Sequence, residues 1–533
     1  MKNNRCLLLF VVALLGLTSC INDLDVKPLD PTVDTADKIY SNPENYEKAL
    51  IKIYSAWALH GQDEWGDIAG LDPGSSVLLR GYFTLQGQSA DEMKASWNDT
   101  WSKDVNSLTW GTTKNDQIEG VYQRAMFLVA LVNEYMKNIP NAPESVDKVR
   151  FAAEARFCRA LSYFVLMDMY GRPPFITEKN YSLNPSQLER KDLFKWIESE
   201  LIEIRDDLPT PVEVVYGRAS QGAVDALLSR MYLNAQVYTG ETRYDDCIEA
   251  SKRVIAAGYE LAPVYRELFM ADNGENPDTR KEFIFPIIFD GQSTMSYAIG
   301  ALIQGCRGVD DFNDVPAGID GGWSGMRASQ NLTRAFEYAD NDNPKASEIL
   351  DKRGIFYDKG RTIDITTTPI LTFETEGWSV HKFTNIKSNG ELGSSLTFPD
   401  TDFPLFRLGE VYLNYAEAVA RGGQGGSEAK AVEYVNALRK RGFGDESYNI
   451  DAAWLKDTGF RNILMERMRE LYWEGVRRTD LVRYDLLTSG SYLWPSKGGI
   501  ITGIGVDKRY NVFPIPSSDM GVNNSLVQNE GYK

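Results

Sequence analysis

The chain holds little material for histidine-based catalysis. His60 and His381 are its only histidines, and they lie far apart in the sequence. A Ser-His-Asp triad needs a histidine oriented between a serine and an acid, and zinc sites commonly use several histidines or cysteines. We find no cysteine pair with zinc spacing and no GxSxG or GxGxxG motif at an expected strand-to-helix turn. These patterns disfavour nucleophilic, zinc and nucleotide-dependent chemistry.

Paired carboxylates are the remaining candidates for catalysis. A glycosidase needs only two acids about 5 to 9.5 Å apart. Asp310, Asp311 and Asp314 form the densest acidic cluster near aromatic residues. Because closeness in sequence does not place two acids across a sugar, a solvated acidic loop is the favoured interpretation. An anchored glycosidase using this cluster stays open as an alternative.

The amino-terminal residues predict an exported, lipid-anchored protein. A basic start, an apolar run from Leu7 to Leu17 and the lipobox Leu17-Thr18-Ser19-Cys20 are typical of a lipoprotein signal, which predicts a signal peptide at 1–19 and acylation of Cys20. An uncleaved anchor helix is the less favoured reading. We expect residues 20–38, polar and proline-containing, to be a tether, and residues 39–533 to form a single globular domain.

Composition narrows the partners of that domain. The 533 residues carry a net charge of −18, and an acidic surface repels phosphate backbones and anionic headgroups. We therefore expect no nucleic-acid partner, and membrane contact through the lipid. Cys158, Cys247 and Cys306 are too few for a disulfide framework, and within helices a buried free thiol is the usual state.

Helical periodicity dominates two blocks of the chain. It predicts a helix from Asn45, and further helices listed here: 155–170, 193–208, 221–238, 244–257, 405–421, 428–441 and 461–473. The pair 221–238 and 244–257, joined through Gly240, is typical of a tetratricopeptide-like hairpin, which needs neighbours to close its core. The fold class is therefore mainly α, built on a tetratricopeptide-like helical hairpin scaffold.

Two segments, about 60–117 and 261–403, interrupt this scaffold. They are rich in glycine, aspartate and aromatic residues, with short strand-like pieces at 283–289 and 363–371. Long irregular insertions in a helical scaffold often carry binding surfaces. We expect the ligand-binding part of the protein in this irregular, partly β insertion.

Four stretches of the sequence carry a recognisable pattern: CINDLD from Cys20, RFCRALSYFVLMDMYGRPP from Arg156, ERMRELYWEGVRRTDLVRY from Glu466, and FPIPSSDMGVNNSLVQNEGY from Phe513. Their motifs and their order resemble those of the SusD/RagB family of outer-membrane lipoproteins from Bacteroidetes, and the resemblance covers nearly the whole chain. From the residues alone, the arginines and Asp480 of the third stretch suit ion pairs between helix ends, and the fourth stretch suits packing of the tail onto the body.

The resemblance implies a set of glycan-binding residues. In starch-binding members an arc of aromatic rings faces the curved α-glucan, and Trp97, Tyr297 and Trp323 stand at the positions of that arc. Asp72 and Arg80 stand at the positions of its hydrogen-bonding partners. Thr100 replaces an asparagine and is counted as a ligand residue, whereas Ile386 replaces a tyrosine of a mobile loop. The segment between Tyr297 and Trp323 is slightly longer than in those members, which could alter the arc's curvature.

A structural calcium ion is also implied by the resemblance. The acidic positions Asp400 and Asp402 are retained, but a third has become Gly274, with Glu275 beside it. Oxygen ligands of this kind suit Ca²⁺, although two acids and a glycine also suit a solvated turn. No cofactor is implied as required.

From the family we therefore expect a non-catalytic, lipid-anchored protein on the outer surface of the outer membrane. The implied ligand is α-glucan of the starch or malto-oligosaccharide type, and the implied partner is a SusC-like TonB-dependent transporter. The alternatives are capture of a different glycan or cargo by the same fold, and the glycosidase described above.

Overall fold

The computed structural model describes residues 36–61, 66–368, 370 and 375–532. The predicted signal peptide, Cys20 and most of the tether lie outside these residues.

The amino-terminal elements are α2 (Ala36–Ile39), α3 (Glu44–Ser55), α4 (Leu78–Gln88), β1 (Met93–Ala95), α5 (Thr100–Ser107), α6 (Asp116–Asn138), α7 (Lys148–Tyr170), α8 (Arg190–Ile204), α9 (Gln221–Leu233), α10 (Ala235–Thr239) and α11 (Tyr244–Ala256). The remaining elements are α12 (Pro277–Glu282), β2 (Phe283–Ile287), α13 (Gly300–Ile303), α14 (Val309–Asp314), β3 (Met326–Ala328), α15 (Gln330–Thr333), β4 (Phe356–Tyr357), β5 (Ser379–Val380), β6 (Phe403–Arg407), α16 (Leu408–Ala420), α17 (Glu428–Phe443), α18 (Ala452–Leu455), α19 (Arg461–Leu471), α20 (Arg477–Arg483) and α21 (Ser517–Val522).

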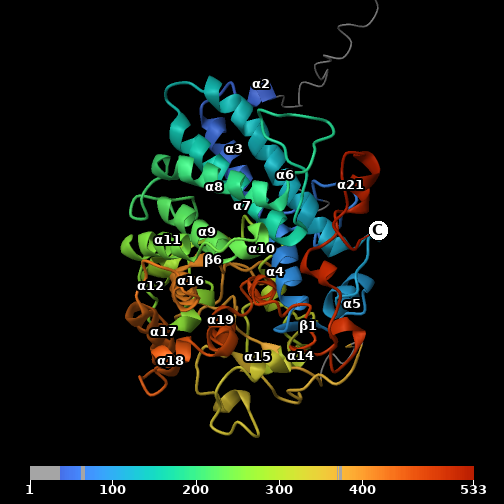
Figure 1. Ribbon diagram of the computed structural model, residues 1–533, viewed down its shortest axis with the longest axis vertical. Coiled ribbons are helices and arrows are strands. Elements are labelled where there is room, and N and C mark those ends of the chain that lie inside the picture. Colours follow the sequence, from blue (N-terminus) through green and yellow to red (C-terminus); the bar gives the residue numbers. More distant parts are fainter. Residues whose placement is uncertain (1–35, 62–65, 369, 371–374, 533) are drawn as a thin grey trace, which may run out of the picture.

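The long helices pack against one another in a continuous stack. Helix α6 packs on α7, α7 on α8, α9 on α11, α11 on α16, and α16 on α17. Figure 1 shows the blue and cyan helices at one end, the green pair α9 and α11 in the middle, and the orange helices below them. The mainly α, tetratricopeptide-like scaffold expected from the sequence is confirmed.

Local sequence explains where the central helices begin and end. Asp147 and Ser220 accept hydrogen bonds from the amides of Arg150 and Ala223, so each caps the first turn of its helix. Helix α7 ends at Tyr170 and is followed by Gly171, whose φ of +71° favours glycine. Phe157 and Leu161 of α7 lie fully buried in the core.

Three sequence predictions differ from the structure. The helix expected at 221–238 is broken at Asn234, whose side chain donates to the Arg230 carbonyl and accepts from Arg483. Residues 405–407, expected to be helical, belong to strand β6, which pairs with β2. The described residues 363–368 form no strand, and part of that predicted strand lies outside the described residues.

Within the described ranges, three two-stranded antiparallel sheets join separate parts of the chain. Strand β1 pairs with β3 so that Met93 lies opposite Ala328, β2 pairs with β6, and β4 pairs with β5. The segment 60–117 is more regular than expected, since it contains α4, β1 and α5. The β1–β3 pair links this segment to 261–403, and it brings the two predicted irregular segments side by side.

The third family stretch supports the fold through buried ion pairs, as predicted. Arg467 pairs with Asp480 at 2.9 Å, and Arg477 pairs with Asp91 at 2.7 Å across most of the chain. Arg478 differs, since it donates to the Tyr510 carbonyl and lies over the ring of Phe513. Phe513 is fully buried, which confirms that the tail packs onto the body.

Candidate functional site

A cavity of about 460 Å³ lies where the two predicted irregular segments meet. Five of the six predicted glycan-binding residues line it: Asp72, Arg80, Trp97, Tyr297 and Trp323. The rest of the lining comes from Ser75, Asp99, Trp101, Asp116 and Gln117. Residues more than 200 positions apart in the sequence therefore share one cavity.

The β1–β3 pair places the two central tryptophans together. Trp97 follows β1 and Trp323 precedes β3, and the Ser96 amide extends the pairing by donating to the Gly325 carbonyl at 2.7 Å. Gly325 lies against the Trp97 ring so closely that a Cβ there would be 1.9 Å from it. The Trp97 Nε1 donates to the Trp323 carbonyl at 3.3 Å, which fixes the orientation of the indole.

Four aromatic rings follow one another along the cavity. The ring centroids of Trp101 and Trp97 are 6.1 Å apart, those of Trp97 and Trp323 are 6.5 Å apart, and those of Trp323 and Tyr297 are 5.7 Å apart. Neighbouring ring planes are tilted by 56°, 50° and 62° respectively. The extra residues between Tyr297 and Trp323 have therefore not separated their rings, and no two neighbouring rings of the row are parallel.

Polar groups lie beside these rings. The Arg80 guanidinium is 5.3 Å from the centroid of the Trp323 ring, within the range of a cation–π contact. Although partial burial opposes the shift, hydrogen bonds from Ser75 and the charge of Arg80 lower the pKa of Asp72 below its ordinary value. Gln117 donates from Nε2 to Ser75 Oγ at 3.0 Å, and this hydrogen bond helps to hold the Ser75 hydroxyl in place.

This arrangement suits a carbohydrate. Each pyranose has an apolar face of C–H bonds that can lie on an aromatic ring, and rigid rings lose little conformational entropy on binding. Asp72 can accept from sugar hydroxyls and Arg80 can donate to them, in charge-assisted hydrogen bonds.

Two positions singled out from the sequence lie elsewhere. Thr100 is the exposed first residue of α5 and is not part of the cavity lining, although Asp99 and Trp101 on either side of it are. Ile386 forms an isolated bridge with Leu392 and also stands outside the lining. Sequence reasoning missed Trp101, which could have been found from its four-residue spacing to Trp97 in the stretch WNDTW.

Two acids of the cluster that suggested a glycosidase, Asp311 and Asp314, form ion pairs with basic side chains. Asp311 is buried and pairs with Arg361 at 3.0 Å, while Asp314 accepts from Tyr357 and Lys359, both at 2.6 Å. Against the effect of burial, hydrogen bonds and the Arg361 charge lower the pKa of Asp311 well below its ordinary value. A general acid needs a raised pKa, so this environment does not suit Asp311 for that role. The side chain of Asp310 lies outside the described residues.

The residues implied for calcium do not form a ligand cluster. Asp402 accepts from Tyr216 at 2.8 Å and from the Phe289 amide at 2.7 Å, and burial raises its pKa to about 7. Asp400 accepts from the Gly291 amide at 2.8 Å and from the Ser394 amide and hydroxyl, both at 2.6 Å. Their oxygens are thus engaged by protein donors.

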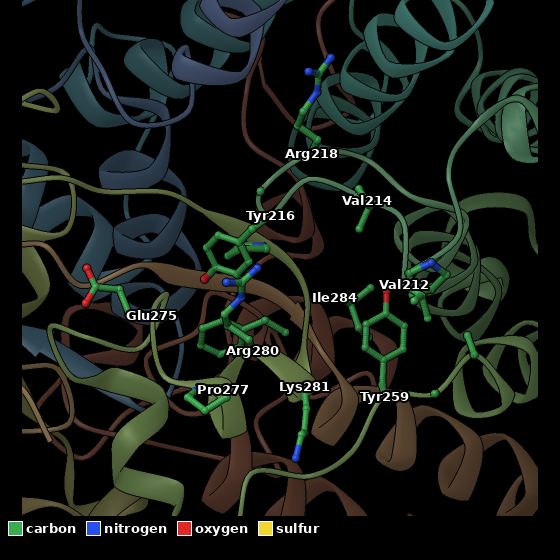
Figure 2. A pocket seen from close by; sticks show the side chains of 16 residues that line it. Val212, Val214, Tyr216, Arg218, Tyr259, Glu275, Pro277, Arg280, Lys281 and Ile284 are labelled. Carbon is green, nitrogen blue, oxygen red and sulfur yellow. The ribbon is translucent and has the colours of Figure 1, made fainter.

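Glu275, the third implied ligand, lines a separate cavity of about 380 Å³ in which Arg280 lies over the Tyr216 ring (Figure 2). Throughout the described ranges, we find no group of three or more His, Cys, Asp or Glu side chains placed to hold a metal ion. Bound calcium stays a prediction, and the hydrogen bonds of Asp400 and Asp402 do not favour it.

Among the helices that the structure describes, none is both long enough and apolar enough to cross a membrane. Membrane attachment through Cys20 stays a prediction, because Cys20 lies outside the described residues.

Comparison with known proteins gives a consistent result. The profile of the SusD family matches residues 281–532, and a profile described as starch-binding associating with outer membrane matches residues 74–233. The chain is 33% identical to the starch-binding protein SusD of Bacteroides thetaiotaomicron, over 100% of both chains.

Solved structures agree on the fold. A SusD-like carbohydrate-binding protein from Bacteroides fragilis superposes with a TM-score of 0.71 at 20% identity, covering 92% of this chain and 100% of that one. A surface glycan-binding protein from Bacteroides thetaiotaomicron, solved with laminarihexaose, gives a TM-score of 0.68 at 20% identity, covering 91% and 99%.

Proposed function

The chain belongs to the SusD family, and on that premise we propose that it captures α-glucan chains of the starch and malto-oligosaccharide type. Proteins of this family bind carbohydrate without cleaving it, and this chain is accordingly a glycan-binding protein and not an enzyme. The glycosidase alternative is therefore set aside. The choice of α-glucan and the partner are the proposed parts.

The row of rings Trp97, Trp323 and Tyr297 beside Asp72 and Arg80 carries this proposal. Successive ring planes in this row are inclined to each other by 50° and 62°, and rings that do not share one plane suit a chain that curves, as α-linked glucose chains do. A flat β-1,4-linked chain would lie on rings that share one plane. The full-length similarity to a protein named for starch binding supports the same choice.

A calorimetric titration tests the ligand class. We would use the full chain carrying Cys20→Ser, which removes the predicted acylation site, with maltoheptaose, α-cyclodextrin, laminarihexaose and cellohexaose. We expect binding to maltoheptaose and α-cyclodextrin, weaker binding to the two β-glucans, and no cleavage of any of them. A preference for laminarihexaose would refute the α-glucan assignment and favour capture of a different glycan.

We further propose that the protein is anchored through Cys20 at the outer surface of the outer membrane and covers a SusC-like TonB-dependent transporter. Modest affinity for a few sugar residues suffices if anchoring beside a transporter raises the local concentration of captured glycan. Purification of the tagged, acylated protein in mild detergent should recover a TonB-dependent transporter in comparable amount. Recovery of the acylated protein alone, under conditions that preserve known outer-membrane complexes, would contradict the partnership.

A further inference from the structure

Trp101 extends the row of rings beyond the three aromatic residues Trp97, Trp323 and Tyr297 that the family resemblance implies. It lies in the first turn of α5, is partly exposed, and lines the same cavity as Trp97. The ring centroids of the two tryptophans are 6.1 Å apart, a spacing close to that between Trp97 and Trp323. The cavity thus offers one more aromatic face, beside Trp97.

Asp99 has a carboxylate that the rest of the protein does not use. It occupies the position before α5 where an aspartate normally accepts a hydrogen bond from the first turn, yet its side chain makes no such capping bond. Its carboxylate has no hydrogen-bond or ion-pair partner within the described part of the chain, and it lines the cavity beside Trp101. Both of its oxygens are available to accept from a ligand.

The charge of the lining limits which sugars fit. Among the described residues of the lining, Asp72, Asp99 and Asp116 contribute three carboxylates, whereas Arg80 is the one cation. Lys114 lies outside the lining, 3.3 Å from Asp116, and offsets part of that charge. A sugar that carries a carboxylate or sulfate would meet like charge at short range, and an uncharged sugar would not.

We propose that Trp101 and Asp99 form an additional sugar subsite beside Trp97, and that this subsite takes an uncharged sugar. The inference rests on the proposed function, since it presumes that a glycan occupies the neighbouring rings. The Trp101 ring covers the apolar face of the sugar, and Asp99 accepts from its hydroxyl groups. A chain long enough to reach from Tyr297 past Trp97 gains this contact, and a short one does not.

Titration with oligosaccharides of increasing length tests the subsite. We would compare maltotriose with maltoheptaose on the full Cys20→Ser chain and on Trp101→Ala and Asp99→Asn variants of it. We expect the affinity for maltoheptaose to fall about five- to tenfold in Trp101→Ala, the loss typical of one aromatic contact, and severalfold in Asp99→Asn. Maltotriose affinity should stay within about twofold in both variants, because the central rings hold it.

Two controls separate the subsite from other effects. Asp104→Asn removes a carboxylate from the same helix, outside the cavity lining, and should change neither affinity. Trp323→Ala should weaken both sugars, because it removes a central ring. Equal losses for both sugars in Trp101→Ala, or no loss for either, would overturn the subsite while leaving the proposed function intact. No binding of either sugar by the chain with its rings intact would overturn both.

A second experiment tests whether the subsite takes only an uncharged sugar. Maltoheptaose oxidised at its C6 carbons to carboxylates keeps the linkage and length but becomes anionic. We expect it to bind at least tenfold more weakly than maltoheptaose at low ionic strength, with part of the loss recovered in Asp99→Asn and by added salt. Equal binding of the two sugars would overturn the charge limit.

Discussion

Replacement of Trp323 by alanine is the most informative perturbation of the proposed site. Trp323 stands between Trp97 and Tyr297 in the row of rings, and the Arg80 guanidinium lies over its face at 5.3 Å. The change removes a contact surface for the glycan and the ring that orients Arg80. Because Trp323 is only partly buried, the loss of packing energy should be tolerated.

The expected loss of affinity follows from these contacts. If a sugar covers roughly 60 Å² of the indole, burial at about 25 cal/mol per Å² contributes about 1.5 kcal/mol. Loss of the ring beneath Arg80 frees the guanidinium and costs about 0.5 kcal/mol more. Together these give about 2 kcal/mol, or an affinity for maltoheptaose about 30-fold lower.

Isothermal calorimetry with maltoheptaose measures this change directly. Tyr181→Ala is a matched control, since Tyr181 is an exposed ring with the Lys137 ammonium 4.9 Å from its centroid and lies outside the cavity lining. We expect the control to bind as the unmodified chain does. If a folded Trp323→Ala protein bound maltoheptaose with an affinity within about twofold of that of the unmodified chain, the glycan would not pack on the Trp323 ring.

Three further predictions concern pH, stability and metal. Because the pKa of Asp72 is lowered, its carboxylate stays ionised at neutral and mildly acid pH. Glycan affinity should therefore be constant between about pH 5 and 8 and fall only below about pH 4. A loss of affinity with a midpoint near pH 6, measured by calorimetric titration, would contradict this expectation. Asp91→Asn breaks the buried pair with Arg477 and should lower the free energy of unfolding in urea by about 3 to 5 kcal/mol; a loss below about 1 kcal/mol would contradict the pair's structural role. EDTA should leave the Tm unchanged, because Asp400 and Asp402 are engaged by protein donors; a Tm lowered by EDTA and restored by Ca²⁺ would instead support the calcium prediction.

Helices were predictable where local signals were strong. Gly171 and the two prolines after it mark the end of α7, and the structure ends that helix at Tyr170 as expected. The break at Asn234 was not predictable, because the apolar pattern continues through it. It depends on an Arg483 hydrogen bond from a residue 249 positions away.

Strands depended on partners that local sequence does not reveal. Residues 403–406 form a short apolar run, which has the same appearance in a buried strand and in the first turn of a helix. Pairing with β2 decides the outcome, and Arg407 at its end makes buried ion pairs with Glu282, Glu470 and Glu474. These partners come from two separate parts of the chain, Glu282 at the end of α12 and Glu470 and Glu474 at and just after the end of α19.

Five side chains of the candidate site were predictable from the family resemblance. The other five residues that line the cavity were not. Trp97 and Trp323 were singled out by position, but the β1–β3 pair that joins them is a long-range contact. Trp101 and Asp99 enter the cavity because α5 begins between them, and Thr100 turns away from it for the same reason.

A crystal structure of the chain with α-cyclodextrin would show whether the row of rings binds α-glucan. We expect electron density for the sugar ring against Trp97, Trp323 and Tyr297, with sugar hydroxyls within hydrogen-bond distance of Asp72 and Arg80. Density for the sugar at any other surface, with these three rings uncovered, would contradict this expectation.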